Sequence, residues 1–156
     1  MTTIILQPKD INPDHLKQIL TLIIKGEQVN RDGLQNRILR ADLIAYMVQN
    51  EQVICTATLK NPHSSYRTKV FNQAKTEIVP DNYKELGYIV THPNFERKGH
   101  CQKLLKIFFK EIDRYSLFAT TRKPSIVHIL RKFGFSQAGK TYNHDLNLLI
   151  YNGKES

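Results

Sequence analysis

Apolar residues in the first part of the chain recur at helical spacing. After a short apolar run at 3–6, which predicts a strand, Asn12 and Pro13 are typical of a helix start. Asparagine is a favoured N-cap, and proline is favoured at the first helical position. Gly26 is placed to end this helix. One face between these limits is apolar and consists of Leu16, Ile19, Leu20, Ile23 and Ile24.

The next apolar segments are shorter. A weaker helical pattern covers 30–40, and the runs at 42–48 and 52–59 predict two antiparallel strands joined by a polar turn. Residues 60–82 are polar and lack a long periodic pattern, so we expect a loop with at most a short strand or turn of helix. A loop of this length in a compact domain is often functional.

Strands and helices alternate in the second half of the chain. We expect a strand at 85–91, ended by His92-Pro93, and then the longest helix, from Gly99 to Tyr115. The remaining predicted elements are a strand at 116–120, a short helix at 125–132 and a terminal hairpin from Gly139 to Tyr151. The pattern indicates a mixed α/β fold. A length of 156 residues suits one domain, which we expect to span 1–156.

The cysteines and the apolar content limit the class of protein. Cys55 and Cys101 are too few for a disulfide framework, so we expect a reducing, cytoplasmic environment. No apolar stretch reaches the roughly 18 residues of a membrane span, and the N-terminus does not resemble a signal peptide. The six histidines show no metal-binding spacing, so we expect no metal and no membrane partner.

The positive charge of the chain is concentrated in one region. The net charge is +9, and the segment 94–132 holds ten Lys and Arg residues against three acidic ones. This segment contains a charged turn, ERKGHC at 96–101, between the predicted strand and the longest helix. The first turn of a helix has unpaired N–H groups and a partial positive charge, and a glycine lets a ligand approach. The junction therefore favours an anion such as phosphate, although solvated charges at an ordinary helix start explain the local pattern as well.

Two motifs resemble the GNAT family of acetyl-CoA-dependent N-acetyltransferases. The stretch ELGYIVTHPNFERKGHCQKLL at 85–105 is similar to the family's strand, pyrophosphate loop and helix, and HILRKFGF at 128–135 is similar to its closing LYEKLGF segment. The order of predicted elements along the whole chain also fits. The resemblance implies a mixed, mostly antiparallel sheet with a splayed pair of strands, flanked by helices.

The resemblance also implies acetyl-CoA as the cosubstrate and an amine as the acceptor, with direct transfer in a ternary complex. The implied cofactor-binding residues are Ile89, Val90 and Thr91, through their backbone, and Arg97, Lys98, Gly99, His100, Cys101 and Gln102 in the loop and first helical turn. Glu96 and Cys101 depart from the family's loop pattern, which has Gln or Arg at the first position and Gly or Ala at the last. Glu96 places a carboxylate near the expected pyrophosphate, and Cys101 is larger than the residue that the family has there. Both departures are expected to weaken cofactor binding.

Acetyl transfer to an amine needs a base, because a protonated amine has no lone pair. The resemblance places the base at Glu85, with Tyr88 and His92 on the same strand as reserves and Glu77 and Asp81 as second choices. The family's acid, a tyrosine, is replaced here by a leucine. The position is Leu130, and the possible substitutes are His128, Tyr142 and Cys101.

Several alternatives remain open. The departures at Glu96, Cys101 and Leu130 also fit a coenzyme A binding protein of the same fold that has lost turnover. The basic segment also fits an enzyme that acts on amines carried by RNA or protein, or a nucleic-acid binder, although no reader motif is evident. The acceptor is a small molecule, a protein or an aminoacyl group, and the terminal strands leave a homodimer possible.

Overall fold

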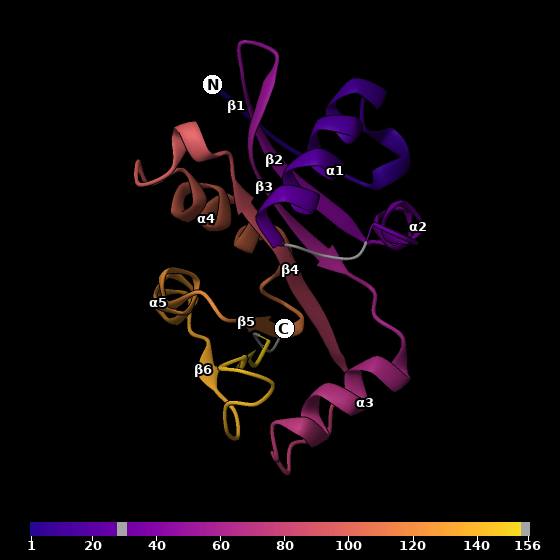
Figure 1. Cartoon of the computed structure of the whole chain (residues 1–156), viewed down its shortest axis with the longest axis vertical. Helices are drawn as coiled ribbons and strands as arrows, with labels where there is room; N and C mark the ends of the chain where they lie inside the picture. The colour runs from indigo at the N-terminus through magenta and orange to yellow at the C-terminus, as the bar shows by residue number, and fades with distance from the viewer. Residues whose placement is uncertain (28–30, 154–156) are drawn as a thin grey trace. The chain divides into compact units, whose positions relative to one another are not determined.

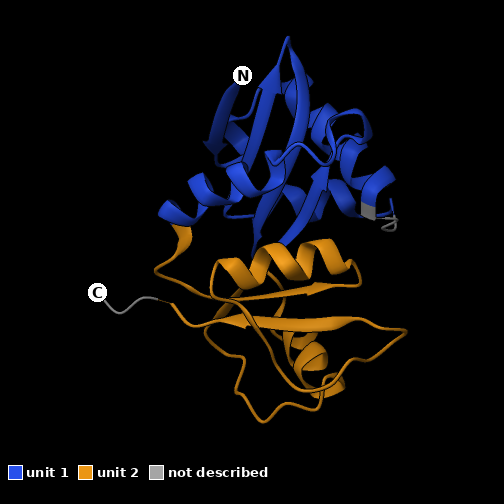
Figure 2. Ribbon diagram, turned by 90° about the vertical axis from the view of Figure 1, so that its left-hand side faces the viewer, with its two compact units in different colours: residues 1–61, 86–111 blue, residues 62–85, 112–156 orange. Residues whose placement is uncertain are grey.

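The computed structural model describes residues 1–27 and 31–153. Seven strands are hydrogen-bonded in the order β1-β2-β3-β4-β5-β7-β6, and helices flank them (Figure 1). The chain forms two compact units, one of residues 1–61 and 86–111 and the other of residues 62–85 and 112–156 (Figure 2). The division passes through strand β4 (Tyr83–Thr91), between Glu85 and Leu86.

The first unit is built on three antiparallel strands. Its elements are β1 (Thr2–Leu6), the 3-10 helix η1 (Pro8–Asp10), α1 (Pro13–Glu27), α2 (Leu34–Leu39), β2 (Leu43–Gln49), β3 (Gln52–Lys60), the later part of β4, the 3-10 helix η2 (Pro93–Phe95) and nearly all of α4 (His100–Ile112). Strand β2 pairs with β1 on one side and β3 on the other, and Asn50 and Glu51 make the tight turn between β2 and β3. Both turn residues have positive φ, as a two-residue hairpin turn requires.

Helix α1 begins as the sequence predicts. The Asn12 side-chain oxygen accepts hydrogen bonds from the backbone N–H of Asp14 at 2.8 Å and of His15 at 3.3 Å. Ile19 and Ile23 of this helix are fully buried and pack in one cluster with Ile44 of β2. The helix runs one residue past Gly26, to Glu27. Gly26 thus lies inside the helix, where an added Cβ would lie 2.4 Å from Val90 Cγ1, so the glycine permits close packing against β4.

The second unit has its own core. Its elements are α3 (Ser64–Gln73), the first three residues of β4, β5 (Ser116–Thr121), α5 (Pro124–Lys132), β6 (Ser136–Gln137) and β7 (Asn147–Tyr151). Strand β7 pairs antiparallel with both β5 and β6, whereas β4 pairs parallel with β5. Phe71 and Phe118 are almost fully buried and contact each other edge to face, with ring centroids 5.4 Å apart. The fold agrees with the predicted mixed, mostly antiparallel sheet flanked by helices.

Three predicted elements need correction. The segment 60–82 is not a loop with at most a turn of helix, because it contains the ten-residue helix α3. The helix predicted over 30–40 is limited to Leu34–Leu39, and residue 30 lies outside the described residues. The terminal hairpin begins earlier than Gly139, since β6 covers Ser136–Gln137 and pairs with the end of β7.

Candidate functional site

The turn before α4 is organised around the ring of Phe95. The ring of His92 lies 5.6 Å from it, the ring of His100 lies 6.2 Å from it, and Lys98 Nζ lies 5.7 Å from its centroid. The backbone N–H of Asn94 donates to Nδ1 of His92 at 3.1 Å, which starts η2. The contacts to one aromatic side chain give the charged turn a defined shape.

Two residues of this turn have left-handed backbones. Arg97 has a φ of 62° and Gly99 a φ of 79°. An added Cβ at Gly99 would meet nothing within 4 Å, so the glycine is needed for its conformation, and the space beside it is open. The Gly99 carbonyl accepts the first helical hydrogen bond of α4 from the N–H of Lys103 at 3.0 Å.

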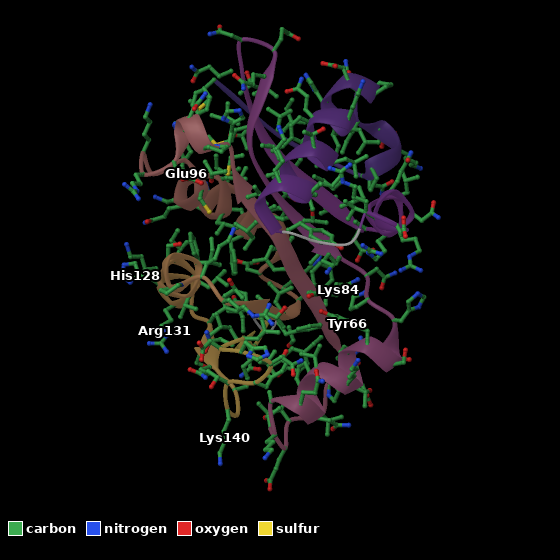
Figure 3. All side chains as sticks on the ribbon, in the orientation of Figure 1. Tyr66, Lys84, Glu96, His128, Arg131 and Lys140 are labelled. Atoms are coloured by element: carbon green, nitrogen blue, oxygen red, sulfur yellow. The ribbon has the colours of Figure 1, made fainter. Side chains whose placement is uncertain are left out.

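The open space therefore lies at the N-terminus of α4. Helix N-termini attract anions through their first N–H groups and the helix dipole. Arg97 and Lys98 are exposed there and His100 is half-buried, so two permanent cations surround the approach to the turn. Glu96 is also exposed, and its label in Figure 3 marks it beside α4. This arrangement suits the binding of an anion.

Strand β4 is irregular at its centre. Tyr88 has a φ of 49°, a left-handed conformation that is rare in a strand and interrupts its alternation. The register of β4 with β5 covers Tyr83 to Glu85, whereas β4 continues to Thr91. The short pairing agrees with the predicted splayed pair. Ile89 and Val90 are buried, each with 5% of its surface exposed.

The two cysteines lie together under the first turn of α4. The Cys55 thiol is buried, lies 3.5 Å from the Thr91 hydroxyl and is hydrogen-bonded to Cys101. The bond with Cys101 lowers the pKa of Cys55, and burial opposes this effect. Cys101, half-buried at the position where the resemblance implies a small residue, thus packs against β3 by a thiol contact.

Glu85 is a buried charged residue of the second unit. Only 2% of its surface is exposed, and its Oε2 accepts a hydrogen bond from the Tyr66 hydroxyl at 3.3 Å. Burial of the Tyr66 hydroxyl, and then the charge of Glu85, raise the pKa of Tyr66 far above its usual value. Although 40% of the Tyr66 surface is exposed, its hydroxyl end is enclosed beside Glu85 and Thr120. Tyr66 therefore stays a neutral donor throughout the physiological pH range.

Tyr142 brings a second hydroxyl to the same carboxylate. Burial, and then the charge of Glu85, raise the pKa of Tyr142 to about 12, while Arg122 has a smaller lowering effect. Among the described residues, the enclosed Tyr142 hydroxyl has no hydrogen-bond partner. A buried hydroxyl without a partner is costly, so a ligand or a water molecule is the expected partner here.

A strained turn positions Tyr142. The three residues that follow it, at 143–145, all have left-handed backbones with φ of 45°, 61° and 68°. Arg122 donates to two carbonyls of this turn, from Nη2 to Asn143 at 2.6 Å and from Nε to His144 at 3.0 Å. Tyr142 and Leu146 exchange backbone hydrogen bonds across the turn. Non-glycine residues held in this region often belong to functional sites.

The predicted catalytic residues fall into different environments. Glu85 is buried with two tyrosines, whereas Glu77 and Asp81 are exposed. His128 is exposed, and Figure 3 shows it on the outer side of α5. Leu130 is fully buried in the core.

Tyr88, the third predicted catalytic residue, lies between two cations. Arg37 Nε donates to its hydroxyl at 3.4 Å, and Lys60 Nζ lies 4.2 Å from its ring centroid.

The sequence interpretation missed Tyr66, Arg122 and Arg37. One sequence feature could have predicted the left-handed turn after Tyr142. Asn, His and Asp, the residue types at 143–145, tolerate the left-handed region best after glycine.

No group of three or more His, Cys, Asp or Glu side chains within 1–27 and 31–153 is placed to hold a metal ion. In the same ranges, no helix is long and apolar enough to cross a bilayer.

Solved structures share this fold. An acyl-CoA N-acyltransferase from Pseudomonas aeruginosa superposes with a TM-score of 0.72 at 11% identity, covering 96% of this chain and 97% of the other. A GNAT family acetyltransferase from Streptococcus agalactiae gives 0.70 at 19% identity, with 99% and 96% covered. A GNAT family acetyltransferase from Elizabethkingia anophelis with acetyl-CoA bound gives 0.65 at 13% identity, with 97% of each chain covered.

The chain therefore has the GNAT acetyltransferase fold, and the predicted fold is confirmed. No protein-family model matches the sequence, and no curated protein matches it significantly. Because similarity at this level of identity establishes the fold alone, the activity has to be argued from the chain's own residues.

Proposed function

We propose that this protein is an N-acyltransferase that uses acetyl-CoA to acetylate an amine, with Glu85 as the general base. The single observation that carries the proposal is the burial of Glu85 beside Tyr66 and Tyr142, on the strand that leads into the anion-binding turn. A carboxylate of the ordinary kind at a strand end would be solvated. This one is enclosed and accepts a hydrogen bond from the neutral Tyr66 hydroxyl.

The turn before α4 suits the pyrophosphate of coenzyme A. The left-handed Gly99 leaves open space at the helix N-terminus, and Arg97 and Lys98 supply positive charge. The implied contacts of Ile89, Val90 and Thr91 would be made by the backbone, since the side chains of Ile89 and Val90 are buried. His100 and the N–H groups of Cys101 and Gln102 belong to the first turn of the same helix.

Glu85 would take the proton that the acceptor amine must lose. The enclosed carboxylate would receive this proton while Tyr66 keeps its hydrogen bond to Oε2 and holds the carboxyl group in place. Attack of the neutral amine on the thioester carbonyl forms the carbon–nitrogen bond, the carbon–sulfur bond breaks, and the second proton that the nitrogen loses passes to the leaving thiolate, so that coenzyme A leaves as the free thiol.

The protein lacks a tyrosine at Leu130, where the resemblance places the acid. Of the substitutes, Tyr142 lies beside Glu85 with an enclosed hydroxyl, whereas His128 is exposed on α5. We therefore assign hydrogen-bond donation in this site to Tyr142. Its raised pKa keeps it protonated at neutral pH, so it would donate a hydrogen bond and retain its proton.

Release of free thiol from acetyl-CoA tests the proposal. The purified protein is incubated with acetyl-CoA and a panel of primary amines, and amine-dependent thiol release is recorded together with the mass of the product. Release that requires an amine and yields an acetylated product supports the enzyme. Coenzyme A binding without any amine-dependent release would support the alternative, a binding protein that has lost turnover.

A further inference from the structure

We propose that Cys55 and Cys101 form a reversible disulfide pair, in which a small-molecule disulfide reacts first with Cys101 and the bond then passes to Cys55. The two residues are the only cysteines of the chain. The modification site itself does not depend on the proposed function. Its effect on coenzyme A binding does rest on the proposed function, because Cys101 belongs to the first turn of α4.

The two thiols meet although they come from different elements of the first unit. Cys55 lies in β3 and Cys101 in α4, and their side chains are hydrogen-bonded to each other. The N–H of His92 donates to the Ile54 carbonyl at 2.7 Å, and the Thr91 hydroxyl lies 3.5 Å from the Cys55 sulfur, so the end of β4 lies beside β3 here. A disulfide requires two sulfur atoms to approach from such a contact to about 2.05 Å. The fold thus brings together the two atoms that a disulfide joins.

The exposure of the two thiols assigns them different roles. Cys55 is 0% exposed, whereas Cys101 is half-buried, so a reagent in solution reaches Cys101 first. Cys101 lies in the first turn of α4, shortly after the exposed Arg97 and Lys98. A helix N-terminus and nearby cations favour the thiolate, which is the form that attacks a disulfide. Cys101 is therefore the attacking thiol, and Cys55 is the resolving thiol.

The exchange has two steps. The Cys101 thiolate attacks one sulfur of the reagent RSSR, which breaks the reagent's S–S bond, forms a mixed disulfide at Cys101 and releases RS⁻. The Cys55 thiolate then attacks the Cys101 sulfur, which forms the bond between the two cysteines and releases the second RS⁻. The two protons that the protein thiols lose are taken up by the two RS⁻ groups. Two protein thiols are oxidised, and one reagent disulfide is reduced to two RSH molecules.

The new bond would change the proposed coenzyme A site. It would tie the first turn of α4 to β3, and the N–H groups of Cys101 and Gln102 would shift with the Cys101 sulfur. The loss of one hydrogen bond to a charged group costs about 1.5 kcal/mol at the lower end, which corresponds to roughly tenfold weaker binding. We therefore expect the oxidised protein to bind acetyl-CoA about tenfold more weakly than the reduced protein.

Mass spectrometry of the intact protein tests the pair. The reduced, folded protein is incubated with hydroxyethyl disulfide and quenched with acid. The wild type should lose two hydrogen atoms and stay a single chain. C55S should stop at the mixed disulfide, because the resolving thiol is missing. C101S should stay unmodified when folded and react in urea, because Cys55 is buried. Circular dichroism checks the fold of each variant, and C55A or C101A replaces a serine variant that does not fold.

Three results would overturn the disulfide pair. They are a wild-type protein that keeps both thiols, a disulfide-linked dimer of two chains, and a folded C101S that reacts as fast as the wild type.

Binding of acetyl-CoA, which has no free thiol to reduce the bond, tests the effect on the cofactor site. The oxidised wild type should bind more weakly, and an added reductant should restore its affinity. Treated and untreated C101S should bind equally, which makes this variant the control for the reagent. Equal affinity of oxidised and reduced wild type would overturn the effect on the site. If the disulfide forms and the reduced protein fails to bind acetyl-CoA, the cysteine pair stands and the proposed acetyl transfer fails.

Discussion

The Tyr66 hydroxyl donates a hydrogen bond to Oε2 of Glu85 at 3.3 Å, and this contact joins α3 to the start of β4. Glu85 has only 2% of its surface exposed, so the orientation of its carboxylate is set by its protein neighbours more than by solvent. A base held in one orientation abstracts a proton more effectively than a mobile one. The contact connects a helix with no recognisable motif to the proposed chemistry.

Replacing Glu85 with glutamine should remove the base and keep the shape of the site. We expect kcat of E85Q to fall between about a hundredfold and ten-thousandfold, the usual contribution of general base catalysis. Coenzyme A affinity should not change, because the residues proposed to bind its pyrophosphate are those of the turn before α4 and do not include Glu85. The assay is amine-dependent thiol release together with calorimetric titration of coenzyme A.

The matched control for this variant is E77Q. Glu77 is exposed in the segment before β4 and was a second choice for the base on sequence grounds. E77Q should keep wild-type kcat. A large loss in E77Q with normal turnover in E85Q would reverse the assignment.

Replacing Tyr66 with phenylalanine should remove one hydroxyl from Glu85 while keeping the ring. A hydrogen bond to a charged group contributes about 1.5 kcal/mol at the lower end, so kcat should fall roughly tenfold. Y115F, which removes a hydroxyl that contacts Arg114, is the control and should have no effect on kcat.

A double-mutant cycle shows whether Tyr66 acts through Glu85. In the E85Q background, Y66F should cost much less than in the wild type, because the group it orients is already gone. Equal losses in both backgrounds would mean that Tyr66 affects turnover by another route.

Glu85 could be located from the sequence, because the alternation and motif of ELGYIVT identify the strand that holds it. Tyr66 could not. The buried residues of α3 are Val70 and Phe71, which are neighbours in sequence and give no helical periodicity. The effect of Glu85 on the pKa of Tyr142 brings together residues more than fifty positions apart in sequence, which local patterns do not predict. The left-handed Tyr88 has no local signal, because tyrosine ordinarily favours a regular strand.

The raised pKa of Tyr142 predicts a loss of stability at alkaline pH. In the unfolded chain the tyrosine ionises near its ordinary value of about 10, whereas in the folded protein the pKa is about 12. Between these values the folded state holds a proton that the unfolded state has lost, so the free energy of unfolding decreases as pH rises. Below pH 10 this contribution is fully present.

Urea unfolding at several pH values checks this prediction. Y142F should show a shallower decrease in the free energy of unfolding between pH 10 and 12 than the wild type. Identical slopes would show that Tyr142 ionises normally in the folded protein.

Replacing Gly99 with alanine should weaken coenzyme A binding by changing the turn itself. The left-handed backbone costs an alanine roughly 1–2 kcal/mol, and the new Cβ would occupy the open space where the anion is proposed to bind. G134A is the matched control, since Gly134 also has a positive φ, of 94°, but lies beside the Tyr151 ring. Both variants should lose similar stability, and only G99A should lose affinity for coenzyme A. Equal affinity in the two variants would place the anion elsewhere.

Thermal unfolding with coenzyme A, acetyl-CoA and dephospho-coenzyme A at matched concentrations tests the central claim most directly. A ligand at 100 times its dissociation constant adds about 2.7 kcal/mol to the free energy of unfolding. The account predicts that coenzyme A and acetyl-CoA raise the melting temperature clearly, that dephospho-coenzyme A raises it less, and that G99A removes most of the shift. An unchanged melting temperature with all three ligands would contradict the coenzyme A site at the start of α4, and with it the proposed acetyl transfer.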